Sequence, residues 1–216
     1  MPKEEHLVAM VARKRYSVRE IYRITHLAAR TAKAGPARSR CDRQSSERIM
    51  LAVTEVNGCE LCSYAHARLA LESGVSDAEV RALLGGVTSG VPDSELAGIA
   101  FAQHYAETRG HPDPSAWTDL VDQYGATRAL CVLRAARMIM WGNALGIPLS
   151  SLRSRLQGSP DPDSSLAYEI GTPLGSLLIT PLALAQGLLG ALRGTQSPPW
   201  DGVLVSTARA HRTARP

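Results

Sequence analysis

Apolar residues at helical spacing, interrupted by short turns of Gly, Pro and Asp, restrict the fold of this chain more than any other feature. Over residues 18–145 they recur three and four positions apart, the period that gives an α-helix one buried face. Alternating β-branched runs bounded by turns, the usual pattern of a strand, are nearly absent. With one Phe and three Trp, the core has to be built from Ala, Leu, Val, Ile and Met. The sequence therefore predicts an all-α fold.

Turn residues separate the expected helices. Gly35-Pro36 ends a first helix over 18–34, and Asn57-Gly58 ends one over 47–56. Asn57 is also expected to cap the following helix, because Glu60 stands three residues later as in a capping box. The other expected helices cover residues 59–72, 76–84, 92–109, 114–124 and 127–145.

Length and charge divide the chain of 216 residues into a body and two additions. Residues 1–40 hold ten Lys or Arg against three acids, so they carry +7 and the remainder carries −3. This basic helical arm is interpreted as a solvated helical face; the alternative is contact with an anionic surface, and a nucleic-acid partner is not expected. A catalytic domain is expected over 41–157 and an apolar C-terminal extension over 158–216.

The C-terminal extension contains 23 residues without a charge, 170–192, enough to span a bilayer. Two prolines, four glycines and several polar residues lower its hydropathy, which favours a buried or subunit-interface helix over contact with a membrane. The first ten residues lack the basic start and apolar core of a secretory signal. A cytoplasmic location with reduced thiols is expected, with membrane association as the alternative.

The residues that carry chemistry are Cys59, Cys62 and His66. Positions three and four apart share one face of a helix, so the three side chains can approach one another. Near the start of a helix, free N–H groups and the helix dipole favour a thiolate. A carboxylate of the preceding helix can fold back toward His66, and reach alone does not choose between Glu47 and Glu55.

Two alternatives to redox chemistry remain for this cluster. A structural zinc site would need two further ligands, drawn from His66, His104, Cys41 and Cys131, because no second CxxC exists. A pair of cysteines packed in the core without chemical function is the other. Redox activity without a metal or organic cofactor is the favoured interpretation. Outside the cluster, His104 is interpreted as a packed helix residue, Cys131 as core and Cys41 as a surface cysteine.

The combination of Glu47, Cys59, Cys62 and His66, with twelve positions from the glutamate to the first cysteine, resembles the alkylhydroperoxidase AhpD-like branch of the carboxymuconolactone decarboxylase superfamily. The similarity extends over residues 47–83, and the helical pattern to about residue 145 is consistent with it. The resemblance implies an AhpD-like helical bundle that assembles as trimers or hexamers. It also implies a peroxidase or disulfide oxidoreductase that reduces hydroperoxides with an external dithiol or thiol protein.

By the same resemblance, Cys62 attacks the peroxide and Cys59 gives a proton and then closes the disulfide. His66 and Glu47 form the proton relay, so the family selects Glu47 where spacing does not. Well-studied peroxidases of the family carry a histidine between the cysteines, and this chain has Leu61 there. The decarboxylase branch lacks the CxxC, so decarboxylation is the least favoured activity. A redox-sensing module, or one that binds a membrane or a partner, on the same fold is the alternative to an enzyme.

Overall fold

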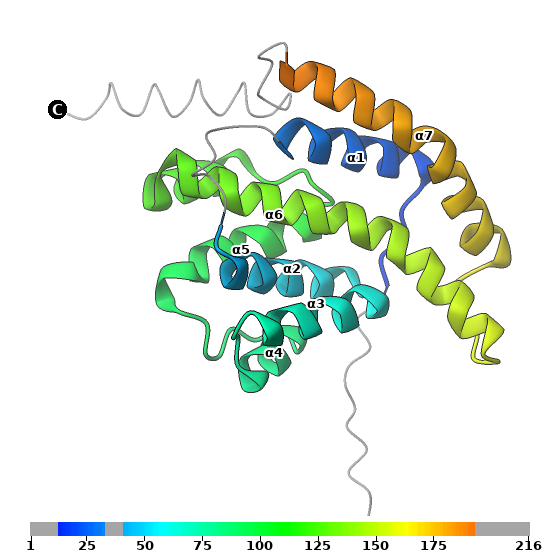
Figure 1. Cartoon of the computed structure of the whole chain (residues 1–216), viewed down its shortest axis with the longest axis horizontal. Helices are drawn as coiled ribbons and strands as arrows, with labels where there is room; N and C mark the ends of the chain where they lie inside the picture. The colour runs from blue at the N-terminus through cyan, green and yellow to red at the C-terminus, as the bar shows by residue number, and fades with distance from the viewer. Residues whose placement is uncertain (1–12, 33–40, 193–216) are drawn as a thin grey trace, which may run out of the picture.

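The structure is a computed structural model that describes residues 13–32 and 41–192. Within those ranges it contains helices and connecting turns but no strand, as Figure 1 shows, so the predicted all-α fold is confirmed. The helices are α1 Val18–Ala32, α2 Arg43–Asn57, α3 Glu60–Glu72, α4 Asp77–Leu84, α5 Asp93–Glu107, α6 Pro114–Leu156 and α7 Leu166–Leu192.

Helix α6 is the centre of the molecule. It contacts α2, α3 and α5 on one side and α1 and α7 on the other, and α4 packs beneath on α2 and α3 (Figure 1). The two helices expected at 114–124 and 127–145 meet at Gly125, whose φ of 74° and ψ of 156° break the helical backbone. The expected end near residue 145 is wrong. The helix continues through Pro148 to Leu156, because Ala144 and Ile147 are buried in the core and hold this stretch in place.

The turn between α2 and α3 differs from the expected one by two residues. Asn57 is the last residue of α2, and Gly58 closes that helix in the left-handed conformation with a φ of 70°. Cys59, not Asn57, is the N-cap of α3, and the predicted cap is therefore wrong. Asn57 is unavailable for capping because its side-chain oxygen accepts a hydrogen bond from the Tyr16 hydroxyl at 2.8 Å in the core.

Helices α1 and α7 lie side by side and form an outer layer over α6 (Figure 1). Glycines permit the close approach: a Cβ added to Gly187 would come within 2.6 Å of the Ala29 Cβ. The start of α7 is fixed by Glu169, which is fully buried and accepts two hydrogen bonds from Arg155, at 2.7 and 2.9 Å. These bonds lower the pKa of the Glu169 carboxyl, which favours its charged form.

The outer face of α7 is apolar and uncovered. The large side chains along it expose between 42% and 80% of their surface: Ile170, Leu174, Leu177, Leu178, Leu182, Leu189 and Leu192. Helices α6 and α7 are both long and apolar enough to cross a membrane, but 67% of the α6 window is buried against 17% of the α7 window. Helix α6 thus has the burial of a core helix, and α7 presents a face that lacks a partner within the described chain.

Candidate active site

The two cysteines of the CxxC motif lie at the start of α3. Cys59 occupies the N-cap position, and its Sγ accepts a hydrogen bond from the Cys62 N–H at 3.4 Å. The two sulfurs are joined as a disulfide, with Cα atoms 5.3 Å apart. Cys59 is fully buried and Cys62 is 8% exposed, so Cys62 is the more accessible sulfur of the two. When the pair is reduced, the open first turn of the helix provides N–H groups that favour a thiolate.

His66 and Glu47 face one another across the α2–α3 pair. The His66 Nδ1 lies 2.7 Å from the Glu47 carboxylate, and their side chains are 18% and 10% exposed. His66 stands one helical turn after Cys62, so its ring belongs to the same face of α3 as that cysteine.

Glu55, the other candidate carboxylate, lies elsewhere. Its carboxylate packs against Gly86 in the turn after α4. Burial and the nearby Glu107 charge raise the pKa of Glu55. The contact with His66 therefore belongs to Glu47, which spacing along the chain alone did not decide.

Gly146 of α6 covers the sulfur pair and was not recognised in the sequence as part of the site. A Cβ added there would lie 2.7 Å from the Cys62 Sγ and 2.8 Å from the Cys59 Sγ, distances that no real side chain tolerates. Only glycine lets the backbone of α6 approach both sulfurs this closely. Glycine lowers helix stability in a helix interior, so its presence inside an apolar helix indicates that another group approaches the backbone there.

Two hollows are lined by the last part of α6. One, of about 240 Å³, is lined by Leu61, Tyr64 and Glu60 of α3 and by residues of the end of α6. The other, of about 310 Å³, is almost entirely apolar and lies between α6 and α7. Leu149 lines both hollows, three residues from the glycine that touches the sulfurs. The hollow beside α3 has a mixed lining, in which Leu61, 40% exposed, lies opposite Arg153 and other polar residues of α6.

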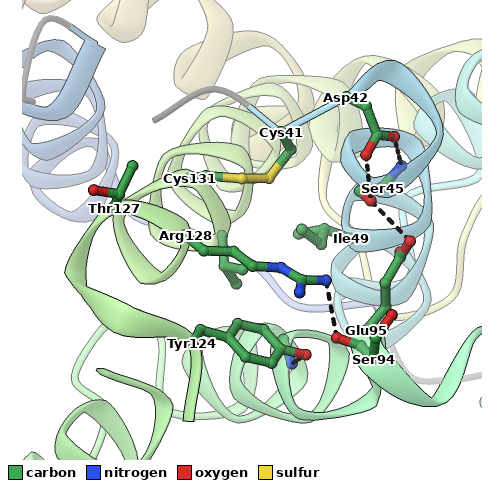
Figure 2. Close-up of a pocket in the computed structure, with 12 residues that line it drawn as sticks. Cys41, Asp42, Ser45, Ile49, Ser94, Glu95, Tyr124, Thr127, Arg128 and Cys131 are labelled. Carbon is green, nitrogen blue, oxygen red and sulfur yellow. Dashed lines mark hydrogen bonds between the residues drawn. A yellow bond between two sulfur atoms is a disulfide. The ribbon is translucent and has the colours of Figure 1, made fainter. Parts of the chain in front are cut away.

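Cys131 is 5% exposed on α6, as expected of a core cysteine, but neither Cys131 nor Cys41 is a free thiol. Cys41 is joined to Cys131 in a disulfide with a Cα–Cα distance of 5.4 Å, which corrects the expectation of reduced thiols at both positions (Figure 2). The turn into α2 brings Cys41 onto α6, a proximity that 90 residues of separation conceal. His104 is partly buried on α5, and its Nε2 accepts a hydrogen bond from the Asp113 N–H at 3.1 Å.

A metal site is not formed by the residues that the structure describes: among them, no three His, Cys, Asp or Glu side chains converge closely enough to hold an ion. In particular, the partners of Cys59 and Cys62 within the described ranges are each other. The ligand set considered above for zinc is thus dispersed, with Cys41 and Cys131 paired elsewhere.

Comparison with known proteins finds one similarity, to a protein family. Residues 23–103 match the model of the carboxymuconolactone decarboxylase family. The superfamily resemblance is confirmed. The matched stretch begins within α1, ends within α5 and contains all four residues of the candidate site. No curated protein and no solved structure matches significantly. Members of this family are often enzymes and often oligomeric, and the family alone does not specify the reaction of this chain.

Proposed function

We propose that this protein is a thiol-dependent oxidoreductase that reduces hydroperoxides, or disulfides, through the Cys59–Cys62 pair. The observation that carries the proposal is the arrangement of that pair at a helix start, with the Glu47–His66 hydrogen bond one turn away. A carboxylate, an imidazole and two thiols together provide a nucleophile, a second thiol to resolve the intermediate and a proton relay. Decarboxylation does not require a pair of cysteines.

The reaction begins with the reduced pair. The Cys62 thiolate attacks one peroxide oxygen, the O–O bond breaks, and the leaving alkoxide takes a proton and departs as an alcohol. Cys62 is then a sulfenic acid. The Cys59 thiolate attacks this sulfur, the Cys59–Cys62 bond forms, and the hydroxyl leaves with a proton as water. An external dithiol reduces the disulfide by exchange and is itself oxidised.

His66 and Glu47 serve the proton transfers of this cycle. The imidazole takes the thiol proton and returns it to the leaving oxygen. The Glu47 carboxylate accepts a hydrogen bond from Nδ1–H and so leaves Nε2 as the nitrogen that exchanges protons with the sulfurs. Glu47 is thus a positioning residue, and Cys62, Cys59 and His66 are the catalytic residues.

Leu61 provides the test that separates a peroxidase from a general disulfide oxidoreductase. We expect Leu61→His to raise hydroperoxide turnover by about tenfold or more, because an imidazole between the cysteines adds a proton donor for the leaving alkoxide. The measurement is dithiol-dependent reduction of an organic hydroperoxide, with reduction of a small-molecule disulfide assayed in parallel.

The matched control is Leu71→His, the same substitution on the same helix at a side chain that is 44% exposed. We expect it to leave both rates unchanged. Absence of both activities in wild type and in Leu61→His would contradict the proposed function. Disulfide reduction that persists without any peroxide turnover would restrict the substrate to disulfides.

The exposed face of α7 supports a further part of the proposal, that copies of the chain associate through it. Replacing both Leu177 and Leu178 by Glu places charges on side chains that are 72% and 80% exposed. We expect sedimentation velocity to show a homo-oligomer for wild type and a monomer for this variant, because the charges would be buried without partners. Trimer or hexamer is the stoichiometry that the family resemblance implies.

The control is Val87→Glu, a 53% exposed position shortly after α4, a helix that does not contact α7 (Figure 1). It should leave the oligomer intact. The wild type could instead be a monomer that co-sediments with anionic vesicles. If the α7 variant does not co-sediment, the result would support a membrane-associated redox module. Retention of the oligomer by the α7 variant would contradict the assembly. A cytoplasmic location is part of the same proposal.

A further inference from the structure

A second disulfide borders another hollow of the structure, away from the CxxC motif. Cys41 and Cys131 line a cavity of about 530 Å³ between the start of α2, α5 and α6 (Figure 2). This volume falls in the range of small-molecule sites. None of its lining residues belongs to the CxxC motif or its histidine and glutamate. Cys41 is partly exposed and Cys131 is 5% exposed, so an incoming molecule meets the Cys41 sulfur first.

Opposite charges stand on different walls of this cavity. Arg128 of α6 reaches across it, with its guanidinium 4.3 Å from the centre of the Tyr124 ring and an N–H donated to the Ser94 carbonyl at 2.9 Å (Figure 2). Glu95 and Asp42 lie on the other walls. Asp42 accepts a hydrogen bond from the Ser45 backbone N–H at 2.8 Å, and Glu95 accepts one from the Ser45 hydroxyl at 2.8 Å.

The contacts of Asp42 favour its charged form. The hydrogen bond from the Ser45 backbone is the main cause that lowers the pKa of Asp42. Glu95 also accepts from the buried Arg48 at 3.1 Å, so part of its charge is balanced. A cation on one wall and carboxylates on the others match a molecule that carries both a carboxylate and an ammonium group.

We propose that the Cys41–Cys131 disulfide is a second thiol–disulfide exchange site, which takes a small zwitterionic thiol of the amino-acid or short-peptide class. The carboxylate of the thiol pairs with Arg128 and its ammonium group with the acidic wall. This places the thiol beside a disulfide sulfur, in a cavity of suitable size.

The exchange balances without another reactant. The thiolate of the small molecule attacks the Cys41 Sγ and forms a mixed disulfide, while the Cys41–Cys131 bond breaks and its electron pair leaves on the Cys131 sulfur, which takes the proton. A second small thiol attacks the small-molecule sulfur of the mixed disulfide and releases Cys41 as a thiol. In total, two small thiols become one small-molecule disulfide, and the protein disulfide becomes two thiols.

The test uses the full-length Cys59→Ser/Cys62→Ser protein, in which only the Cys41–Cys131 pair can react, so its result is independent of the proposed function. Reduced glutathione is the zwitterionic probe, and 2-mercaptoethanol is the uncharged one. Differential alkylation and peptide mass spectrometry follow both cysteines under native conditions. We expect Arg128→Gln to slow opening by glutathione about two- to fivefold, the effect of a partly exposed ion pair, and to leave the rate with 2-mercaptoethanol unchanged.

A control variant and the location of the mixed disulfide complete this test. Arg68→Gln, on the exposed side of α3, should change neither rate. The mixed disulfide is expected on Cys41, with Cys131 free, and this reading does not depend on the Arg128 variant. The proposal is overturned if Arg128→Gln affects both thiols equally, if the pair opens only in denaturant, if glutathione is trapped on Cys131, or if Cys41 and Cys131 fail to pair under oxidising conditions.

Discussion

A Cys62→Ser variant is expected to lose dithiol-dependent turnover by at least about 10³-fold, the effect of removing a nucleophile whose other partners cannot substitute for it. A serine hydroxyl stays protonated where a thiol at a helix start forms a thiolate, so it does not attack a peroxide or a disulfide. The measurement is the initial rate with an organic hydroperoxide and an excess of dithiol, together with a thermal melt of each protein.

Two other variants make this result specific to the nucleophile. Cys59→Ser should still consume one equivalent of peroxide and then stop, because Cys62 is oxidised but no thiol at residue 59 can close the disulfide. Ser63→Ala, on the next position of α3, should retain the wild-type rate and melting temperature. Wild-type turnover in a folded Cys62→Ser protein would show that the reaction takes place elsewhere.

Arg48→Ala is expected to have the largest effect on stability, about 3–5 kcal/mol of unfolding free energy. Arg48 is 7% exposed and pairs with the carboxylates of Glu79, in a short hydrogen bond, and Glu95 at 3.1 Å. These contacts join α2 to the starts of α4 and α5. Without the guanidinium, the negative charges of Glu79 and Glu95 lack their positive partner, and Glu79 is buried. An unpaired buried charge costs more folding free energy than the loss of the ion pair alone. Urea unfolding followed by circular dichroism measures the change.

The control for this variant is Arg68→Ala, which removes an i,i+4 pair with Glu72 at a side chain that is 73% exposed. We expect a change within about 0.5 kcal/mol, because solvent screens such a pair. Arg48→Met combined with Glu79→Gln removes the buried Glu79 charge and should recover part of the loss. Equal changes in unfolding free energy for Arg48→Ala and Arg68→Ala would show that burial of the Arg48–Glu79–Glu95 contacts adds nothing to stability.

Much of the helical pattern could be predicted from local features. Ser76 caps α4 through the Glu79 N–H, and Gly85 follows the last residue of that helix, as the turn residues indicated. The length of α6 could not be predicted in this way. Gly146 and Pro148 are local signals for a helix end, but burial of the same stretch against α2, α3 and α7 outweighs them.

The candidate site was likewise only partly determined by the sequence. Cys59, Cys62 and His66 lie within two helical turns, so their common face follows from the helical period alone. Glu47 was selected only through the family resemblance, since both it and Glu55 precede the turn. The packing angle of α2 on α3 decides which carboxylate faces the histidine.

By itself, then, the sequence determined the all-α fold, the resemblance to the superfamily and the spacing of Cys59, Cys62 and His66, because each depends on residues near one another along the chain. The tertiary structure decided the contact of Gly146 with both sulfurs, the pairing of Cys41 with Cys131 and the exposure of the α7 face. These depend on how helices distant in sequence pack against one another. Local periodicity specifies which face of a helix is apolar, and only packing specifies what that face meets.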